Sequence, residues 1–145
     1  MNQPIPIQKP ETPPRKTILV VDDDDAVRAG LRCVLMTEKY IVLTAINGAQ
    51  ALTTLENHPC DLALIDMNMP FRNGWSTIAG MRTTAPGLPV IIITARPDQR
   101  TLARETGIEL MEKPLDLPLL LQRIRQILET PQNAARPIPG ASGAG

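Results

Sequence analysis

Residues 18–28 read ILVVDDDDAVR, and this stretch decides the fold. Four apolar residues in succession are typical of a strand that helices cover on both faces, and the acidic run ends that strand. The residues AVRAGL that follow indicate a helix, and Asp25 is predicted to cap its start. A buried strand followed directly by a helix is the unit from which parallel α/β sheets are built.

The same alternation of short apolar runs and helical patterns continues along the chain to about residue 130. Three of the runs are apolar at nearly every position, which predicts strands at the centre of a parallel sheet. The last helix is the clearest, because its Leu and Ile side chains fall on one stripe that is expected to face the core. That stripe is Leu117, Leu120, Leu121, Ile124, Ile127 and Leu128. Strands are expected at 17–22, 40–45, 61–66, 89–94 and 108–111, and helices at about 25–37, 48–57, 74–84, 97–105 and 116–129.

The composition fits one compact domain with a different kind of segment at each end. A chain of 145 residues that is 43% hydrophobic can bury one core. Residues 1–16 are predicted to form a flexible Pro-rich leader, and 131–145 a disordered tail or a cut linker, because neither has enough apolar residues to bury. The folded domain is therefore predicted to span residues 17–130.

Charge and cysteine usage exclude several classes of function. Fifteen basic residues balance fifteen acidic ones, so no field directs the chain toward nucleic acid or an anionic membrane. No apolar stretch is long enough for a membrane span or a signal peptide, which predicts a cytoplasmic protein. Cys33 and Cys60 lack the spacing of a disulfide framework or a zinc site and are expected to be reduced.

Polar side chains follow four of the five predicted strands. Asp22 and Asp23 come at the end of the first, Asp66 ends the third, Thr94 ends the fourth, and Lys113 follows the fifth. Because the carboxyl ends of parallel strands share one edge, all five side chains are expected to meet there. Like charges repel by about 4 kcal/mol per pair at 4 Å when the effective dielectric constant is near 20, so a divalent cation is expected among the carboxylates. The set fits phosphoryl transfer, which needs a carboxylate nucleophile, a cation and donors to the phosphoryl oxygens.

Four segments together resemble the receiver domain of two-component response regulators, over essentially the whole predicted domain. They are ILVVDDDDAVR, DLALIDMNMPFRNGW, VIIITA and LMEKPLD. Each residue alone has an ordinary structural interpretation, as a turn or a cap, and the combination is what is specific. The resemblance implies a CheY-like, flavodoxin-like (βα)5 fold with a five-stranded parallel sheet of order 2-1-3-4-5.

The resemblance also implies a function and a role for each site residue. The domain would accept a phosphoryl group from a sensor histidine kinase or a histidine phosphotransfer protein and would catalyse only its own phosphorylation and dephosphorylation. The peptide bond between Lys113 and Pro114 would be cis. Asp66 would be the phosphoryl acceptor; Asp22 (mainly through water), Asp23, Asp66 and the backbone carbonyl of Asn68 would hold Mg²⁺ or Mn²⁺; and Thr94, Lys113 and the backbone amides of Met67 and Ala95 would bind the phosphoryl group.

Two departures from the family concern how the signal is read. Leu110 stands where the family usually has an aromatic residue, and Lys113 follows Thr94 by nineteen positions (113 − 94), fewer than usual. The segment that normally forms the output face is therefore altered. We expect phosphorylation to be retained without driving the common dimer through the fourth and fifth helices, so the chain is predicted to be a monomer or a weak dimer. The downstream partner is expected to be a protein.

Three alternatives stay open at this point. A pseudo-receiver would keep the fold as an interaction module with little or no phosphorylation, although neither the acceptor nor the acidic pair is lost here. A phosphatase of the haloacid dehalogenase type would use Asp22 as nucleophile and leave Asp66 unexplained. A DNA-binding regulator is possible only if the chain is a fragment, because nothing after Pro131 can form a recognition helix.

Overall fold

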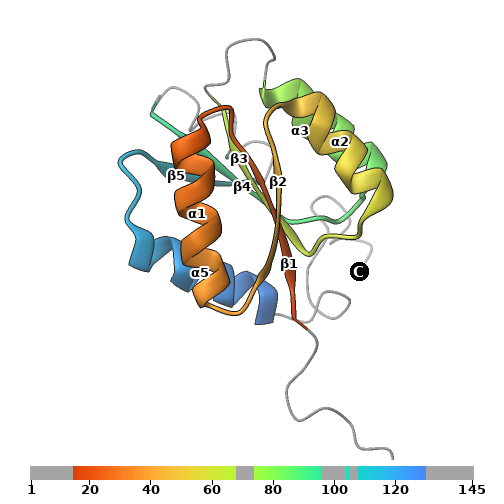
Figure 1. Cartoon of the computed structure of the whole chain (residues 1–145). Helices are drawn as coiled ribbons and strands as arrows, with labels where there is room; N and C mark the ends of the chain where they lie inside the picture. The colour runs from red at the N-terminus through yellow and green to blue at the C-terminus, as the bar shows by residue number, and fades with distance from the viewer. Residues whose placement is uncertain (1–14, 68–73, 96–103, 105–107, 130–145) are drawn as a thin grey trace, which may run out of the picture.

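The computed structural model describes residues 15–67, 74–95, 104 and 108–129. Five parallel strands form one sheet of order β2-β1-β3-β4-β5, as the resemblance implied. Helices lie on both faces of this sheet (Figure 1). The strands are β1 (Thr17–Val21), β2 (Ile41–Ala45), β3 (Leu62–Asp66), β4 (Val90–Thr94) and β5 (Glu109–Glu112), and the helices are α1 (Asp25–Thr37), α2 (Gly48–Asn57), α3 (Gly74–Thr84) and α5 (Leu117–Glu129). The helix predicted at about 97–105 lies outside the described residues except for Arg104.

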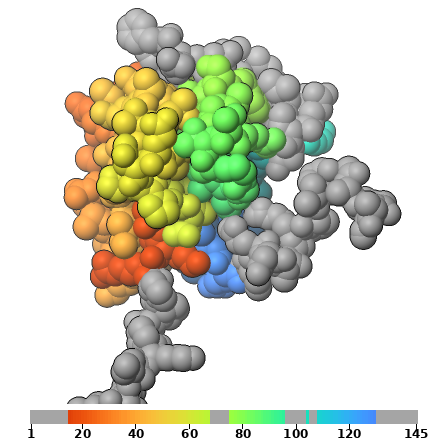
Figure 2. Space-filling model, turned by 90° about the vertical axis from the view of Figure 1, so that its right-hand side faces the viewer, coloured from red at the N-terminus to blue at the C-terminus, as the bar shows by residue number. Residues whose placement is uncertain are grey.

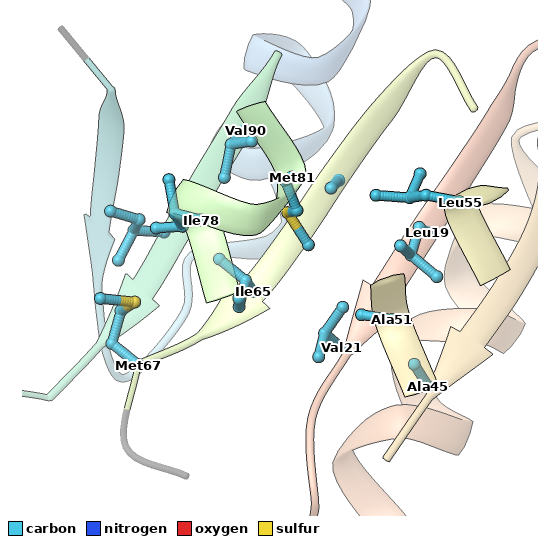
Figure 3. Packing of buried hydrophobic residues seen from close by; sticks show 12 residues of the cluster. Leu19, Val21, Ala45, Ala51, Leu55, Ile65, Met67, Ile78, Met81 and Val90 are labelled. Atoms are coloured by element: carbon cyan, nitrogen blue, oxygen red, sulfur yellow. The ribbon is translucent and has the colours of Figure 1, made fainter. Parts of the chain in front are cut away.

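The core has two halves, one on each face of the sheet, because successive side chains of a strand point to opposite faces. In β1, Leu19 and Val21 pack with α2 and α3, whereas Ile18 and Val20 pack with α1 and α5. Every residue of β3 and β4 is buried, which confirms that these strands lie at the centre of the sheet. Figure 3 shows the half of the core beneath α2 and α3.

Helices α2 and α3 lie side by side over one face of the sheet (Figure 2). Their close approach depends on Gly80 of α3, because a Cβ atom at this position would lie 2.8 Å from Cδ1 of Leu52 in α2. Any larger residue would push the two helices apart or force Leu52 to move.

The start of α1 corrects one prediction. Asp24, not Asp25, is the N-cap, and its carboxylate accepts hydrogen bonds from the backbone amides of Ala26 and Val27 at 2.9 and 3.0 Å. Any of the four aspartates offers the same capping oxygen. The backbone makes the choice, because Asp24 has the extended conformation that an N-cap requires and Asp25 is already helical.

The apolar stripe of α5 is confirmed in its middle and wrong at its first residue. Leu120 and Ile124 are fully buried against the sheet, while Leu117 is 36% exposed. Leu117 is the first residue of the helix, and the stripe meets the core only one turn later. An ion pair also joins α5 to the edge strand β5. The guanidinium of Arg123 in α5 donates to both carboxylate oxygens of Glu109 in β5, at 3.0 and 2.8 Å.

The structure bears on the state of the two cysteines and on whether a helix could span a membrane. Cys33 and Cys60 are free thiols, as expected, and burial raises the pKa of the Cys60 thiol to about 11. Among the helices of the described residues, none combines the length and the apolar character that crossing a membrane demands.

Candidate functional site

Three carboxylates gather at the carboxyl edge of the sheet. β1 and β3 are neighbours with Val21 opposite Ile65, so Asp22 and Asp66 emerge next to each other. One carboxylate oxygen from each of Asp22, Asp23 and Asp66 lies within 4.8 Å of the others. Asp22 and Asp66 are only 3% and 4% exposed, whereas Asp23 is exposed. The structure therefore brings together the acidic residues that the sequence placed at this edge.

The environment of Asp22 makes its negative charge costly. The pKa of Asp22 is raised to about 6, mainly by burial and to a smaller extent by the charges of Asp66 and Asp23. Two groups act in the opposite direction: the backbone amide of Asp24, which donates to Oδ1 of Asp22 at 2.9 Å, and the ammonium of Lys113. A carboxylate held in this way favours a cation beside it.

Lys113, which follows the edge strand β5, supplies a positive charge to the cluster. Its Nζ lies 3.4 Å from Oδ1 of Asp66. The strand pairing explains this position, because Thr94 of β4 is opposite Glu112 of β5 and the Lys113 amide donates to the Thr94 carbonyl at 2.8 Å. The peptide bond between Lys113 and Pro114 is cis, as predicted.

Thr94 lies at the same edge, on the strand next to Asp66. It is the last residue of β4 and is fully buried, and the residue before it, Ile93, is opposite Asp66. Ala95 follows on the surface. Thr94 therefore lies beyond Asp66 in the direction in which both strands run.

Two of the backbone groups assigned from the resemblance belong to Met67 and Asn68, the residues that follow Asp66. The Met67 amide donates to the Ile93 carbonyl at 3.0 Å, which continues the pairing of β3 with β4. Binding of a phosphoryl oxygen by this amide therefore requires that hydrogen bond to be shared or broken. Asn68, whose carbonyl is a predicted metal ligand, lies outside the described residues.

Sequence reasoning missed one residue at the site, Arg28 of α1. Its Nη1 donates to the backbone carbonyl of Asp22 at 2.8 Å, and its Nη2 forms an ion pair with Asp25. The spacing of Asp25 and Arg28, three apart in a helix, could have indicated the ion pair. No sequence pattern indicates a hydrogen bond from a side chain to the carbonyl of a strand end.

The sheet order and the strand-end acidic cluster define a flavodoxin-like α/β domain with its polar site at the carboxyl edge of the sheet. Comparison with known families makes this assignment more specific. The chain belongs to the response regulator receiver domain family, whose model matches residues 18–129. It is therefore a receiver domain of the kind found in two-component response regulators, and a haloacid dehalogenase-type phosphatase is not its family.

Relatives with known names agree. The response regulator MprA of Mycobacterium sp. (strain KMS) is 37% identical over 114 residues, which make up 77% of this chain and 50% of MprA. The transcriptional regulatory protein GlrR of Escherichia coli (strain K12) is 35% identical over 115 residues, which make up 77% of this chain and 26% of GlrR. The chain thus matches only half of MprA and about a quarter of GlrR.

Solved structures of receiver domains have the same fold. A receiver domain protein (CheY-like) from Methanospirillum hungatei JF-1 has a TM-score of 0.74 at 28% identity, covering 80% of this chain and 95% of that one. The response regulator protein TrrA from Thermotoga maritima, in complex with Mg(2+)-BeF, has a TM-score of 0.72 at 29% identity, covering 78% of this chain and 99% of that one.

Proposed function

We propose that this receiver domain accepts a phosphoryl group on Asp66 and signals through the resulting conformational change. The observation that carries the proposal is the buried Asp66 carboxylate, which shares its site with two other carboxylates and has the Lys113 ammonium 3.4 Å away. The donor is a phosphohistidine of a sensor histidine kinase or a histidine phosphotransfer protein. An oxygen of Asp66 forms a bond to phosphorus while the bond between phosphorus and the histidine nitrogen breaks, which leaves an aspartyl phosphate.

The donor set fits Mg²⁺ or Mn²⁺. Asp22, Asp23 and Asp66 offer clustered carboxylate oxygens, which are the ligands that these hard cations prefer, and burial raises the pKa of Asp22, which makes a neutralising cation favourable. In the proposed site Asp23, Asp66 and the Asn68 carbonyl hold the ion directly, and Asp22 holds it mainly through a bound water. Bound there, the ion neutralises the carboxylates and the charge of an incoming phosphoryl group. TrrA, bound to Mg(2+)-BeF, supports this by its likeness.

Lys113 and Thr94 are the proposed phosphoryl-binding side chains. The Lys113 ammonium already lies beside Oδ1 of Asp66, so it could bind a phosphoryl group on the Asp66 carboxylate with little movement. Thr94 has a hydroxyl at the neighbouring strand end, which can donate to a phosphoryl oxygen. The Ala95 amide is the proposed backbone donor next to Thr94. The Met67 amide is the other proposed backbone donor, and to bind a phosphoryl oxygen it must share or give up its hydrogen bond to the Ile93 carbonyl.

Intact mass spectrometry tests the proposal. After incubation with Mg²⁺ and acetyl phosphate, the wild-type chain should gain the mass of one phosphoryl group, and Asp66→Asn should gain none because the amide is not a nucleophile. The matched control is Asp61→Asn, which changes an aspartate that precedes β3 and holds the start of β1 through the Thr17 amide. A phosphoryl group on the Asp66→Asn chain would contradict the proposal by showing another acceptor. A wild-type chain that gains no phosphoryl group would also contradict it and would favour the pseudo-receiver.

The way the signal is read should differ from the usual family mechanism. In the family, the aromatic residue at the position of Leu110 usually rotates inward on phosphorylation. Leu110 of β5 is half-buried and packs against the core beneath α2 and α3, and its aliphatic side chain cannot play the part of that ring. We therefore expect sedimentation velocity to give a monomer or a weak dimer both with and without beryllofluoride and Mg²⁺. Strong dimerisation that depends on beryllofluoride would refute this expectation.

The proposed setting follows from the family and from the composition. The domain acts in the cytoplasm, receives its phosphoryl group from the kinase or phosphotransfer protein, and passes the signal to a downstream protein. With a net charge of zero, it binds neither nucleic acid nor membrane directly.

A further inference from the structure

We infer that Arg28 is a positioning residue for the metal-binding carboxylates: it fixes the turn between β1 and α1 so that Asp22 and Asp23 point into the site. This inference rests on the proposed metal site and adds a residue to it. Arg28 acts through the backbone of the turn, because its guanidinium binds the carbonyl of Asp22 and the carboxylate of Asp25.

The guanidinium joins the two ends of the turn. Nη1 donates to the carbonyl of Asp22, the first residue after β1, at 2.8 Å, and Nη2 pairs with the carboxylate of Asp25, the first residue of α1. On its other side, the Asp22 backbone is held to the sheet by its amide, which donates to the Ala45 carbonyl at 3.1 Å. The Arg28 side chain is only 17% exposed, so the link to Asp22 is partly protected from water.

The link to Asp22 does not compete with a metal for the same atom. The Asp24 amide donates to Oδ1 of Asp22, and that oxygen belongs to the carboxylate that the ion would use. Arg28 instead uses the backbone carbonyl of Asp22. It can therefore hold the turn both when the carboxylates are bare and when they coordinate a cation.

Asp23 depends most on the turn. Within the described part of the chain its carboxylate makes no hydrogen bond and no ion pair, and it is exposed, so only the backbone conformation places it within 4.8 Å of the other two carboxylates. A residue that restrains residues 22–25 thus determines where this oxygen lies. Misplacing a metal ligand weakens binding even when the ligand itself is unchanged.

Arginine suits this role better than lysine. Its planar, forked guanidinium can donate to the carbonyl and to the carboxylate at once, whereas a lysine ammonium is a point charge on a flexible stem. Arg32, one turn further along α1, is a natural comparison, because it is exposed and makes no hydrogen bond or ion pair within the described residues.

Isothermal titration of the full chain with Mg²⁺ tests the inference, using Arg28→Ala, Arg28→Lys and the control Arg32→Ala. We expect Arg28→Ala to raise the dissociation constant for Mg²⁺ about tenfold, which is the usual effect of removing a partner that orients a metal ligand. Arg28→Lys should recover only part of this loss, although its charge is unchanged. Arg32→Ala should bind Mg²⁺ like the wild type, although it removes the same charge from the same helix.

Hydrogen exchange separates a positioning role of Arg28 from a general loss of stability. In magnesium-free protein, the amides of Asp24 and Ala26 should exchange faster in Arg28→Ala than in the wild type, while the amides of β3 and β4 stay equally protected. Equal Mg²⁺ dissociation constants for wild type and Arg28→Ala, or equal losses in Arg28→Ala and Arg32→Ala, would overturn the inference. A wild-type chain that fails to bind Mg²⁺ would instead overturn the proposed metal site.

Discussion

In magnesium-free buffer, ionisation of Asp22 alone should lower the free energy of unfolding by about 2 kcal/mol as the pH rises from about 4 to about 7. Burial raises the pKa of this carboxyl from 3.8 to about 6 in the folded chain. Below about 3.8 the group is protonated in both states and its stabilising contribution is fully present. As the pH rises through about 6 the contribution is lost, because the unfolded chain ionises more easily than the buried site.

The variant Asp22→Asn isolates this contribution. Asparagine keeps the oxygen that accepts from the Asp24 amide but cannot ionise, so the variant and the wild type should differ by less than about 1 kcal/mol near pH 4. Near pH 7 the variant should be the more stable by about 3 kcal/mol. Urea unfolding in EDTA at several pH values measures both stabilities. In their difference, the titration of carboxylates that do not interact with Asp22 cancels. Two parallel stability curves would show that Asp22 titrates normally.

The fold was predictable because burial leaves a direct trace in the sequence. β1, β3 and β4 are apolar at nearly every position, because a strand that is covered on both faces buries the side chains on both of them. The acidic cluster was predictable for a related reason. Asp22 and Asp66 directly follow or end such strands, and parallel strands bring their carboxyl ends to one edge.

Other features depend on geometry that the residue types do not encode. Four aspartates in a row offer equivalent capping oxygens, so only the backbone conformation shows that Asp24 is the N-cap and Asp25 is not. The hydrogen bond from the Met67 amide to the Ile93 carbonyl is likewise invisible in the sequence, since it follows from the register of β3 against β4. Arg28 was missed because its partner is a backbone carbonyl, which every residue possesses. Such contacts become visible only when the chain is folded.

Replacing Lys113 by methionine should lower the free energy of unfolding by about 2 kcal/mol at neutral pH in magnesium-free buffer. Methionine keeps most of the apolar stem and removes the ammonium, which leaves Asp66 buried beside two other carboxylates. Removing one partner of a buried ion pair costs about 3–5 kcal/mol. We expect less here, because the Lys113 side chain is 32% exposed and water screens part of its charge.

Two comparisons attribute this loss to the carboxylate cluster. Lys16→Met, the same change at an exposed lysine before β1, should alter stability by less than about 0.5 kcal/mol. Adding Lys113→Met to Asp66→Asn should cost far less than adding it to the wild type, because the negative charge that the ammonium offsets at residue 66 is already absent. Saturating Mg²⁺ should also shrink the loss, since a cation among the carboxylates takes over the neutralising role of the ammonium. If the loss is the same in the wild-type and Asp66→Asn backgrounds and does not respond to Mg²⁺, Lys113 stabilises the fold through its stem and not through the charge that it places beside Asp66.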